Sequence, residues 1–129
     1  AHEREMATAI AAHSEVPVLD NVGKDTLPQL LALLSRASVL LSPDSGPVHM
    51  ATMVGLPVIG LYAATNPARS GYLSRAHCVD AYARAALRFR ASTPERLPWT
   101  TKIEEPGVMD LIEVDEVCAR LDALVGSGA

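Results

Sequence analysis

The chain has 129 residues, of which 49% are hydrophobic and 20% charged, and this composition fits one modest globular domain. Its 15 acidic and 11 basic side chains give a net charge of -4, which excludes the broad electrostatic attraction of nonspecific nucleic-acid binders. No apolar run approaches the roughly 20 residues that a membrane-spanning helix needs. Cys78 and Cys118 lie too far apart to suggest a zinc site or a disulfide framework, and a reducing, cytoplasmic setting fits best.

The first residues predict a helix followed by a strand. Residues 1–13 are rich in helix formers, and Met6 and Ile10 are spaced to lie on one face. Val16–Leu19 is a short β-branched and apolar run whose proline suits the start or edge of a strand. Because the sequence opens directly in this helix at Ala1, without a signal-like segment, we expect that an N-terminal part of the protein is missing.

A second helix and a buried strand come next. Thr26 and Gln29 have the spacing of a capping box, and leucines at one-face helical spacing continue to a helix end near Arg36. Residues 38–42 (SVLLS) form a continuous apolar run of strand length, typical of a strand buried on both faces. This segment is therefore predicted to be central in a sheet.

A tight turn and a short helix connect that strand to another one. Residues 43–46 (PDSG) are all turn formers, and Pro47 suits the first turn of a helix that runs through Met53 and ends at Gly55. Residues 57–61 (PVIGL) predict a second buried strand. Strand, helix and strand without a hairpin form a βαβ unit, so we expect an α/β fold with a parallel sheet and flanking helices.

The remainder predicts a loop, a strand and two helices. Residues 62–75 have few aliphatic side chains, and an irregular loop of this length is often functional. A short strand at residues 78–81 precedes a helix at residues 82–89. Residues 91–107 contain three prolines and are expected to be irregular, before a last helix over residues 114–125.

The turn DSGPVHMA, residues 44–51, is the strongest candidate site. It lies between a buried strand and the helix that follows, where open α/β sheets bind ligands. The free amides at the helix start favour an anion such as phosphate, and Gly46 allows a diphosphate close to the backbone. Asp44 would accept hydrogen bonds from sugar hydroxyls, and His49 could donate one to a phosphate or ribose. The structural alternative is that Asp44 and Ser45 merely cap the helix.

Two segments resemble a known family. Residues 39–67 (VLLSPDSGPVHMATMVGLPVIGLYAATNP) resemble the C-terminal half of glycosyltransferase family 9, the heptosyltransferases that use ADP-heptose to build lipopolysaccharide. Residues 22–37 (VGKDTLPQLLALLSRA) are similar to the family segment that leads to this turn. The resemblance implies that residues 1–129 are a single, partial C-terminal domain of a GT-B enzyme, with a Rossmann-like fold that binds the nucleotide-sugar donor.

The resemblance also implies roles for individual residues. Asp44 matches an aspartate that binds donor sugar hydroxyls, whereas the turn and the histidine after it match residues beside the diphosphate. Asp25 and Thr26 correspond to a turn beside the base and ribose, and Thr65 matches part of a G-x-T-x-P loop in which Ala63 replaces the usual glycine. The donor-binding residues are thus expected to be Asp44, Ser45, Gly46, Pro47, His49, Asp25, Thr26 and Thr65.

Other expectations concern parts outside the chain. In the family a carboxylate of the N-terminal, acceptor-binding domain acts as the general base, so we expect no catalytic residue here and no transfer by this chain alone. No metal or cofactor is required besides the donor substrate. The acceptor would be the lipopolysaccharide core, at the inner face of the inner membrane with a peripheral contact. Because sheet edges would be exposed, we expect the chain to self-associate.

Several further residues have weaker interpretations. Arg69 and Arg75 follow the loop and suit recognition of a phosphate or of the acceptor. A basic group could meet anionic lipids or core phosphates, although a solvated helix face is the simpler interpretation; it comprises Arg84, Arg88, Arg90, Arg96 and Lys102. His2, His13 and His77 are scattered. The two cysteines are expected to be small buried hydrophobes, and Trp99 to pack the closing segment onto the domain.

Two other functions are compatible with the fold. A nucleotide- or phosphate-binding module without catalysis would use the same turn as a generic anion nest and would bind many nucleotides alike. A response-regulator-like domain shares the parallel sheet but needs an acidic cluster at the strand ends, for which the chain offers only Asp20 and Asp44.

Overall fold

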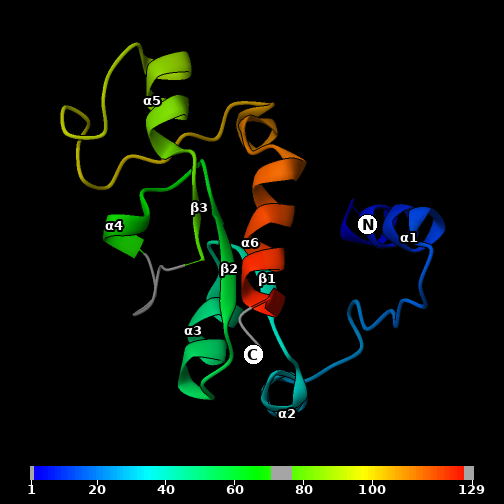
Figure 1. Cartoon of the computed structure of the whole chain (residues 1–129). Coiled ribbons are helices and arrows are strands. Elements are labelled where there is room, and N and C mark those ends of the chain that lie inside the picture. Colours follow the sequence, from blue (N-terminus) through cyan, green and yellow to red (C-terminus); the bar gives the residue numbers. More distant parts are fainter. Residues whose placement is uncertain (1, 71–76, 127–129) are drawn as a thin grey trace.

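A computed structural model describes residues 2–70 and 77–126 (Figure 1). Three parallel strands form one sheet in the order β1 (Leu40–Pro43), β2 (Val58–Tyr62) and β3 (Val79–Asp80). The helices are α1 (His2–His13), α2 (Leu27–Arg36), α3 (Gly46–Met53), α4 (Pro67–Ser70), α5 (Tyr82–Arg90), the 3-10 helix η1 (Val108–Leu111) and α6 (Val114–Gly126). The predicted α/β class with a parallel sheet is confirmed.

The predicted caps and breakers fix the ends of α2 and α3. Thr26 Oγ1 accepts a hydrogen bond from the Gln29 amide at 3.4 Å, and the Gln29 side chain accepts one from the Thr26 amide at 2.9 Å. This capping box begins α2 where the sequence predicted it. Pro47 lies in the first turn of α3, and Gly55 follows the helix with a φ of +74°, a conformation that favours glycine.

The sheet is covered by helices, which lie on either side of β2 in Figure 1. Helix α3 contacts β1, β2 and α2, whereas α6 contacts β2 and β3. The first core cluster joins α2, α3 and β2 and consists of Leu34, Val48, Ala51, Leu56, Val58 and Tyr62. All of β2 except Leu61 is buried, as expected for a central strand with covered faces.

A second core cluster secures the irregular segment at residues 91–107. It consists of Ala63, Ala81, Tyr82, Ala85, Ala86, Ile103 and Val108. Ile103 is completely buried, and its amide donates a hydrogen bond to the Ala64 carbonyl at 2.8 Å. The Tyr82 hydroxyl donates another to the Thr101 carbonyl at 3.0 Å. These contacts place residues 101–104 beside the carboxyl end of β2.

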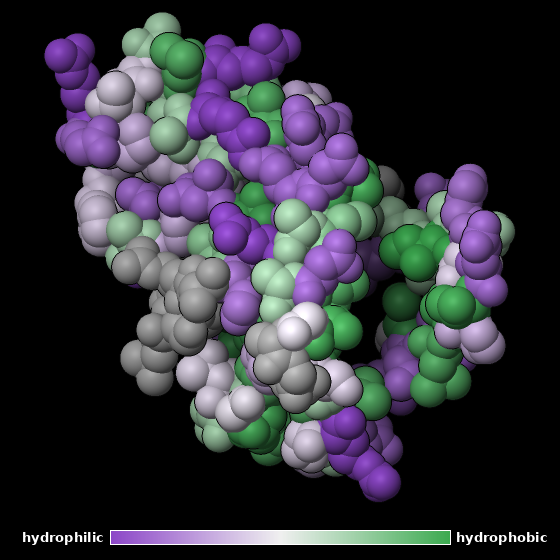
Figure 2. Space-filling view, viewed as in Figure 1, coloured by the Kyte–Doolittle hydropathy of each residue, from purple (hydrophilic) through white to green (hydrophobic). Residues whose placement is uncertain are grey.

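Residues 2–25 form an arm, made of α1 and residues 14–25, that lies apart from the sheet (Figure 1). The predicted strand at Val16–Leu19 is wrong, because this segment pairs with none of the strands described. Arg4 forms an ion pair with Asp20, which joins the two ends of the arm. Hydrophobic side chains are exposed along the arm (Figure 2). Among them, Ile10 is 61% and Leu19 is 81% exposed.

Candidate functional site

The turn after β1 places Asp44, Ser45 and Gly46 at the start of α3. Ser45 is the N-cap residue of this helix, yet its side chain makes no capping hydrogen bond. Its hydroxyl instead lies 2.9 Å from the hydroxyl of Ser42, a buried residue of β1. The Ser45 side chain therefore does not cap the helix, so the structural alternative is wrong for this residue. The backbone amides at the start of α3 are left for another hydrogen-bond acceptor.

The backbone of this turn is open to a ligand. A Cβ atom added to Gly46 would meet no heavy atom within 4 Å, so nothing in the described protein occupies the space beside it. Pro47 has no amide hydrogen, and the Val48 amide donates to the Ser45 carbonyl at 3.2 Å. An anion would therefore approach the helix start at Gly46, where the amide dipoles favour negative charge.

A cavity of about 200 Å³ lies at the carboxyl ends of β1 and β2. Asp44, directly after β1, and Thr65, shortly after β2, both line it, as the resemblance led us to expect of two donor-binding residues. The carboxyl edge of a parallel sheet is the usual place for a ligand in this fold class. The complete lining is Pro43, Asp44, Leu61, Ala64, Thr65, Lys102, Glu104 and Met109.

Lys102 and Glu104 are site residues that the sequence analysis missed. In the sequence Lys102 belongs to the same basic group as the arginines, but in the structure it lines the cavity with Asp44 because Ile103 fixes the segment against the end of β2. Lys102, Ile103 and Glu104 alternate charged and apolar side chains, a pattern typical of an extended segment that can be seen in the sequence. The sequence does not show that this segment lies close to Asp44, because that approach depends on a contact between distant parts of the chain.

The other predicted donor-binding residues lie elsewhere. His49 is exposed on α3 and does not line the cavity. Asp25 lines a separate cavity of about 220 Å³ at the start of α2, together with Asn21, Lys24, Gln29 and Leu33. The Thr26 hydroxyl next to it is used in the capping box. The structure thus brings together Asp44 and Thr65, but not these two with Asp25 and Thr26.

The arginines proposed for a phosphate or the acceptor are not part of the Asp44 cavity. Arg69 lies half-buried on the short helix α4, outside the lining of that cavity. Arg75 lies outside the described residues.

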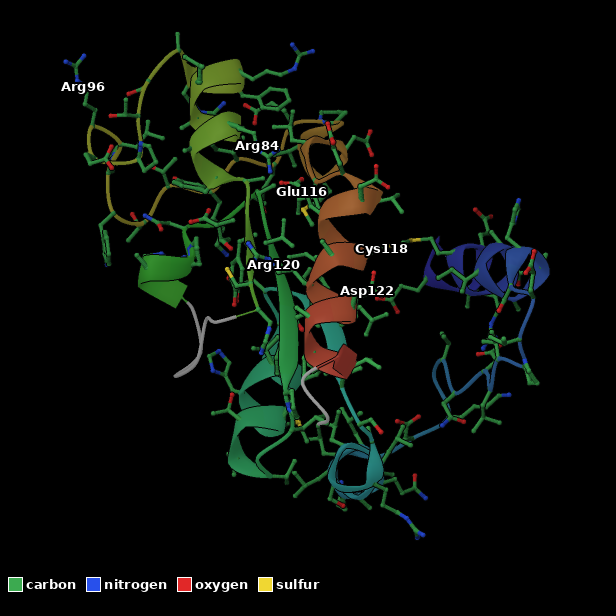
Figure 3. The ribbon with its side chains drawn as sticks, in the orientation of Figure 1. Arg84, Arg96, Glu116, Cys118, Arg120 and Asp122 are labelled. Atoms are coloured by element: carbon green, nitrogen blue, oxygen red, sulfur yellow. The ribbon has the colours of Figure 1, made fainter. Side chains whose placement is uncertain are left out.

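The basic group of the sequence is partly neutralised by acidic neighbours. The Arg84 guanidinium lies 2.8 Å from a carboxylate oxygen of Glu116 on α6 (Figure 3), and Arg90 forms an ion pair with Glu105. A backbone hydrogen bond at Glu113 and the Arg84 side chain lower the pKa of Glu116, and Arg90 lowers that of Glu105. Arg96 extends away from the body of the chain in Figure 3.

Two expectations about buried side chains are wrong. Cys118 is exposed on α6, because that helix buries little beyond Leu124; Cys78 is half-buried and packs against the first core cluster. Trp99 does not pack the closing segment, since 62% of it is exposed.

Within residues 2–70 and 77–126, no three His, Cys, Asp or Glu side chains gather as metal ligands, and no helix is long and apolar enough to cross a membrane.

Comparisons with known proteins agree on one family. The sequence model of glycosyltransferase family 9 (heptosyltransferase) matches residues 1–96. The lipopolysaccharide core heptosyltransferase OpsX of Haemophilus influenzae is 38% identical over 123 residues, which cover 95% of this chain and 35% of that protein. Lipopolysaccharide heptosyltransferase 3 of Escherichia coli is 42% identical over 50 residues, covering 39% of this chain and 15% of that protein. No solved structure shows a significant match.

The chain therefore spans about a third of the length of OpsX, the relative that it matches over most of its own length. The family match covers the DSGPVHMA turn, both strands that flank it and the residues that line the cavity up to Thr65. Lys102 and Glu104 lie beyond the family match, but the similarity to OpsX extends over 123 residues of this chain and includes both. With its fold and its sequence in agreement, the chain belongs to glycosyltransferase family 9.

Proposed function

We propose that this chain is the donor-binding part of an inverting glycosyltransferase that moves heptose from ADP-heptose to the inner core of lipopolysaccharide. The observation that carries the proposal is the cavity in which Asp44, Thr65 and Lys102 meet, next to the open backbone at Gly46. Membership of the family and the printed names of the relatives support the reaction class.

Each part of the site has a task in this reaction. Asp44 accepts hydrogen bonds from hydroxyls of the donor sugar and so orients the ring for attack. The helix start at Gly46 and the Lys102 ammonium stabilise the negative charge that builds on the departing diphosphate. His49 donates a hydrogen bond to a phosphate oxygen or to the ribose, and Asp25 and Thr26 lie beside the base.

The transfer itself needs groups beyond this chain. We infer an N-terminal domain that holds the lipopolysaccharide acceptor and supplies the carboxylate that deprotonates its attacking hydroxyl. Catalysis then takes place in the cleft between the two domains, so the present chain alone binds the donor without transferring it. Since the proposed acceptor is lipopolysaccharide, we expect the whole enzyme to act in the cytoplasm, in peripheral contact with the inner face of the inner membrane.

Amide NMR titrations of the chain with ADP, UDP and ADP-heptose test this proposal. We expect saturable shifts at Ser45, Gly46 and His49 that are larger with ADP than with UDP and that extend to Asp44 only with the sugar nucleotide. Equal shifts with all three ligands would indicate instead a nucleotide-binding module without donor specificity. Amides that respond to none of them, in a well-dispersed spectrum, would contradict the assignment of the site.

A further inference from the structure

The segment at residues 102–109 forms one side of the candidate donor cavity, and we call this segment the wall. Three of its residues line the cavity, namely Lys102, Glu104 and Met109. Asp44 and Thr65, which line the cavity from the ends of β1 and β2, lie within the family match at residues 1–96. The wall lies after that match, so the cavity combines a part that the family match covers with a part that it does not.

The wall is held in place by the second core cluster. Ile103 is completely buried, and its amide donates a hydrogen bond to the Ala64 carbonyl at 2.8 Å. Val108, near the other end of the wall, is buried in the same cluster. A segment that is anchored near both ends can hold its side chains in a fixed geometry around a ligand.

Side chains along the wall alternate between a structural task and the cavity. Successive side chains of an extended segment point to opposite sides. Ile103 accordingly lies in the core and Glu105 forms an ion pair with Arg90, whereas Lys102 and Glu104 line the cavity. Among the described residues, no ion pair or hydrogen bond engages the Glu104 side chain, so its carboxylate is available to a ligand.

The size and chemistry of the cavity suit the sugar part of a donor. Its volume of about 200 Å³ is below the range of about 300 to 1,000 Å³ of sites that take a whole drug-sized ligand, so it fits one ring rather than a complete nucleotide sugar. An ionised carboxylate only accepts hydrogen bonds, so Glu104 suits a hydroxyl and disfavours a phosphate. Met109, which is 37% exposed, adds a flexible apolar side chain for the C–H surface of a ring.

We propose that Glu104 and Met109 of the wall select the donor sugar. Glu104 accepts a hydrogen bond from a hydroxyl of the ring that Asp44 also holds, and Met109 contacts the ring and limits its size. That this ring belongs to a nucleotide-sugar donor rests on the proposed function. Such a site discriminates between donors because a sugar without the matching hydroxyl leaves a desolvated carboxylate unpaired.

Glu104→Gln tests the hydroxyl contact in calorimetric titrations with ADP-heptose and ADP. The substitution keeps the volume of the side chain and removes its charge, so the affinity for ADP-heptose should fall about three- to tenfold. The affinity for ADP, which lacks the transferred sugar, should not fall. Glu95→Gln, the same change at an exposed residue outside the lining of this cavity, should alter neither affinity. An unaltered affinity of Glu104→Gln for ADP-heptose, or an equal loss for both ligands, would overturn the proposal.

Met109→Trp tests the limit on size. The larger side chain narrows the cavity, so ADP-heptose should bind no more tightly than ADP, whose own affinity should stay the same. ADP-mannose, whose sugar has one carbon fewer than heptose, should lose less affinity than ADP-heptose does. Met6→Trp, the same change at an exposed position of α1, is the control and should bind all three ligands as the parent does. Parent-like binding of ADP-heptose by Met109→Trp, or equal losses for the two sugars, would overturn the proposal.

Amide shifts separate this inference from the proposed function. If ADP-heptose shifts the Gly46 amide while Glu104→Gln and Met109→Trp bind it as the parent does, the donor site stands and the role of the wall is refuted. If ADP-heptose shifts the amides of Glu104 and Met109 but no nucleotide shifts Gly46, the wall binds sugar as proposed and the diphosphate assignment is refuted.

Discussion

Gly46 offers the most direct test of the helix start as a diphosphate site. A methyl group at this position meets open space in the protein, so Gly46→Ala should keep the fold and leave the unfolding midpoint unchanged or slightly higher. The same methyl group would occupy the path of a phosphate to the backbone. We expect the affinity for ADP to fall by about tenfold or more in calorimetric titrations, by about the energy of one charged hydrogen bond.

Gly126→Ala is the matched control, because a Cβ there also meets nothing within 4 Å. It should change neither the unfolding midpoint nor the affinity for ADP by a measurable amount. If Gly46→Ala binds ADP as well as the parent chain does, then the diphosphate does not approach the backbone at this turn.

Lys102 and Asp44 are expected to act on different parts of the donor. Lys102→Met removes a cation from the cavity and should weaken ADP binding about tenfold while adenosine binding stays the same, because only the phosphates are charged. Arg96→Met, which removes an exposed cation elsewhere, is the control and should weaken neither. Equal losses for ADP and adenosine in Lys102→Met would contradict a phosphate contact.

Asp44→Asn tests the sugar contact. The substitution keeps the shape of the side chain but removes its charge, so hydroxyls of the donor sugar lose a strong acceptor. The affinity for ADP-heptose should fall about three- to tenfold more than that for ADP in the same titrations. Similar losses for both ligands would show that Asp44 does not distinguish the sugar.

At the scale of elements, the ion pair between Arg84 and Glu116 joins α5 to α6. Glu116 also accepts the Glu113 amide at 2.9 Å at the start of α6, and these interactions lower the pKa of Glu116. A carboxyl group with a lowered pKa in the folded state contributes stability at neutral pH, and this contribution is lost as the pH falls through the folded-state value.

The chain should therefore lose thermal stability between about pH 5 and pH 3, and part of this loss should be absent in Glu116→Gln. The comparison is made between unfolding midpoints of the variant and the parent at both ends of that range. Asp122→Asn, an exposed change on the same helix, should retain the pH dependence of the parent. A variant with the full pH dependence of the parent would show that Glu116 contributes none of it.

The elements differ in how far the sequence could predict them. The capping box of α2, the positions of the strands β1 and β2 and the glycine after α3 rest on neighbours along the chain, and these were predicted correctly. The central, doubly buried placement predicted for residues 38–42 is wrong, because β1 is the edge strand of the described sheet and only Ser42 on it is buried. The Val16–Leu19 segment has a strand-like composition but no partner among the described strands, and a strand needs one. The approach of Lys102 to Asp44 depends on the burial of Ile103 by residues far away in sequence, so no local pattern could show it.

At the scale of the whole molecule, apolar side chains are left exposed at one edge of the sheet and along the arm. The strand β1 has no neighbour on its outer edge among the described strands, and Leu41 on it is 53% exposed. The arm adds the exposed side chains of Met6, Ile10, Val16, Val18 and Leu19 (Figure 2). Unpaired strand edges and exposed apolar side chains favour pairing with another chain.

We accordingly expect the chain by itself to self-associate, with a mean mass that rises with concentration in sedimentation equilibrium. Leu41→Lys places a charge on the edge strand and should shift the equilibrium toward the monomer. Leu87→Lys, the same change at an exposed apolar position of α5, should leave it unchanged. A parent chain that stays monomeric at all concentrations would show that the arm and the β1 edge do not promote association.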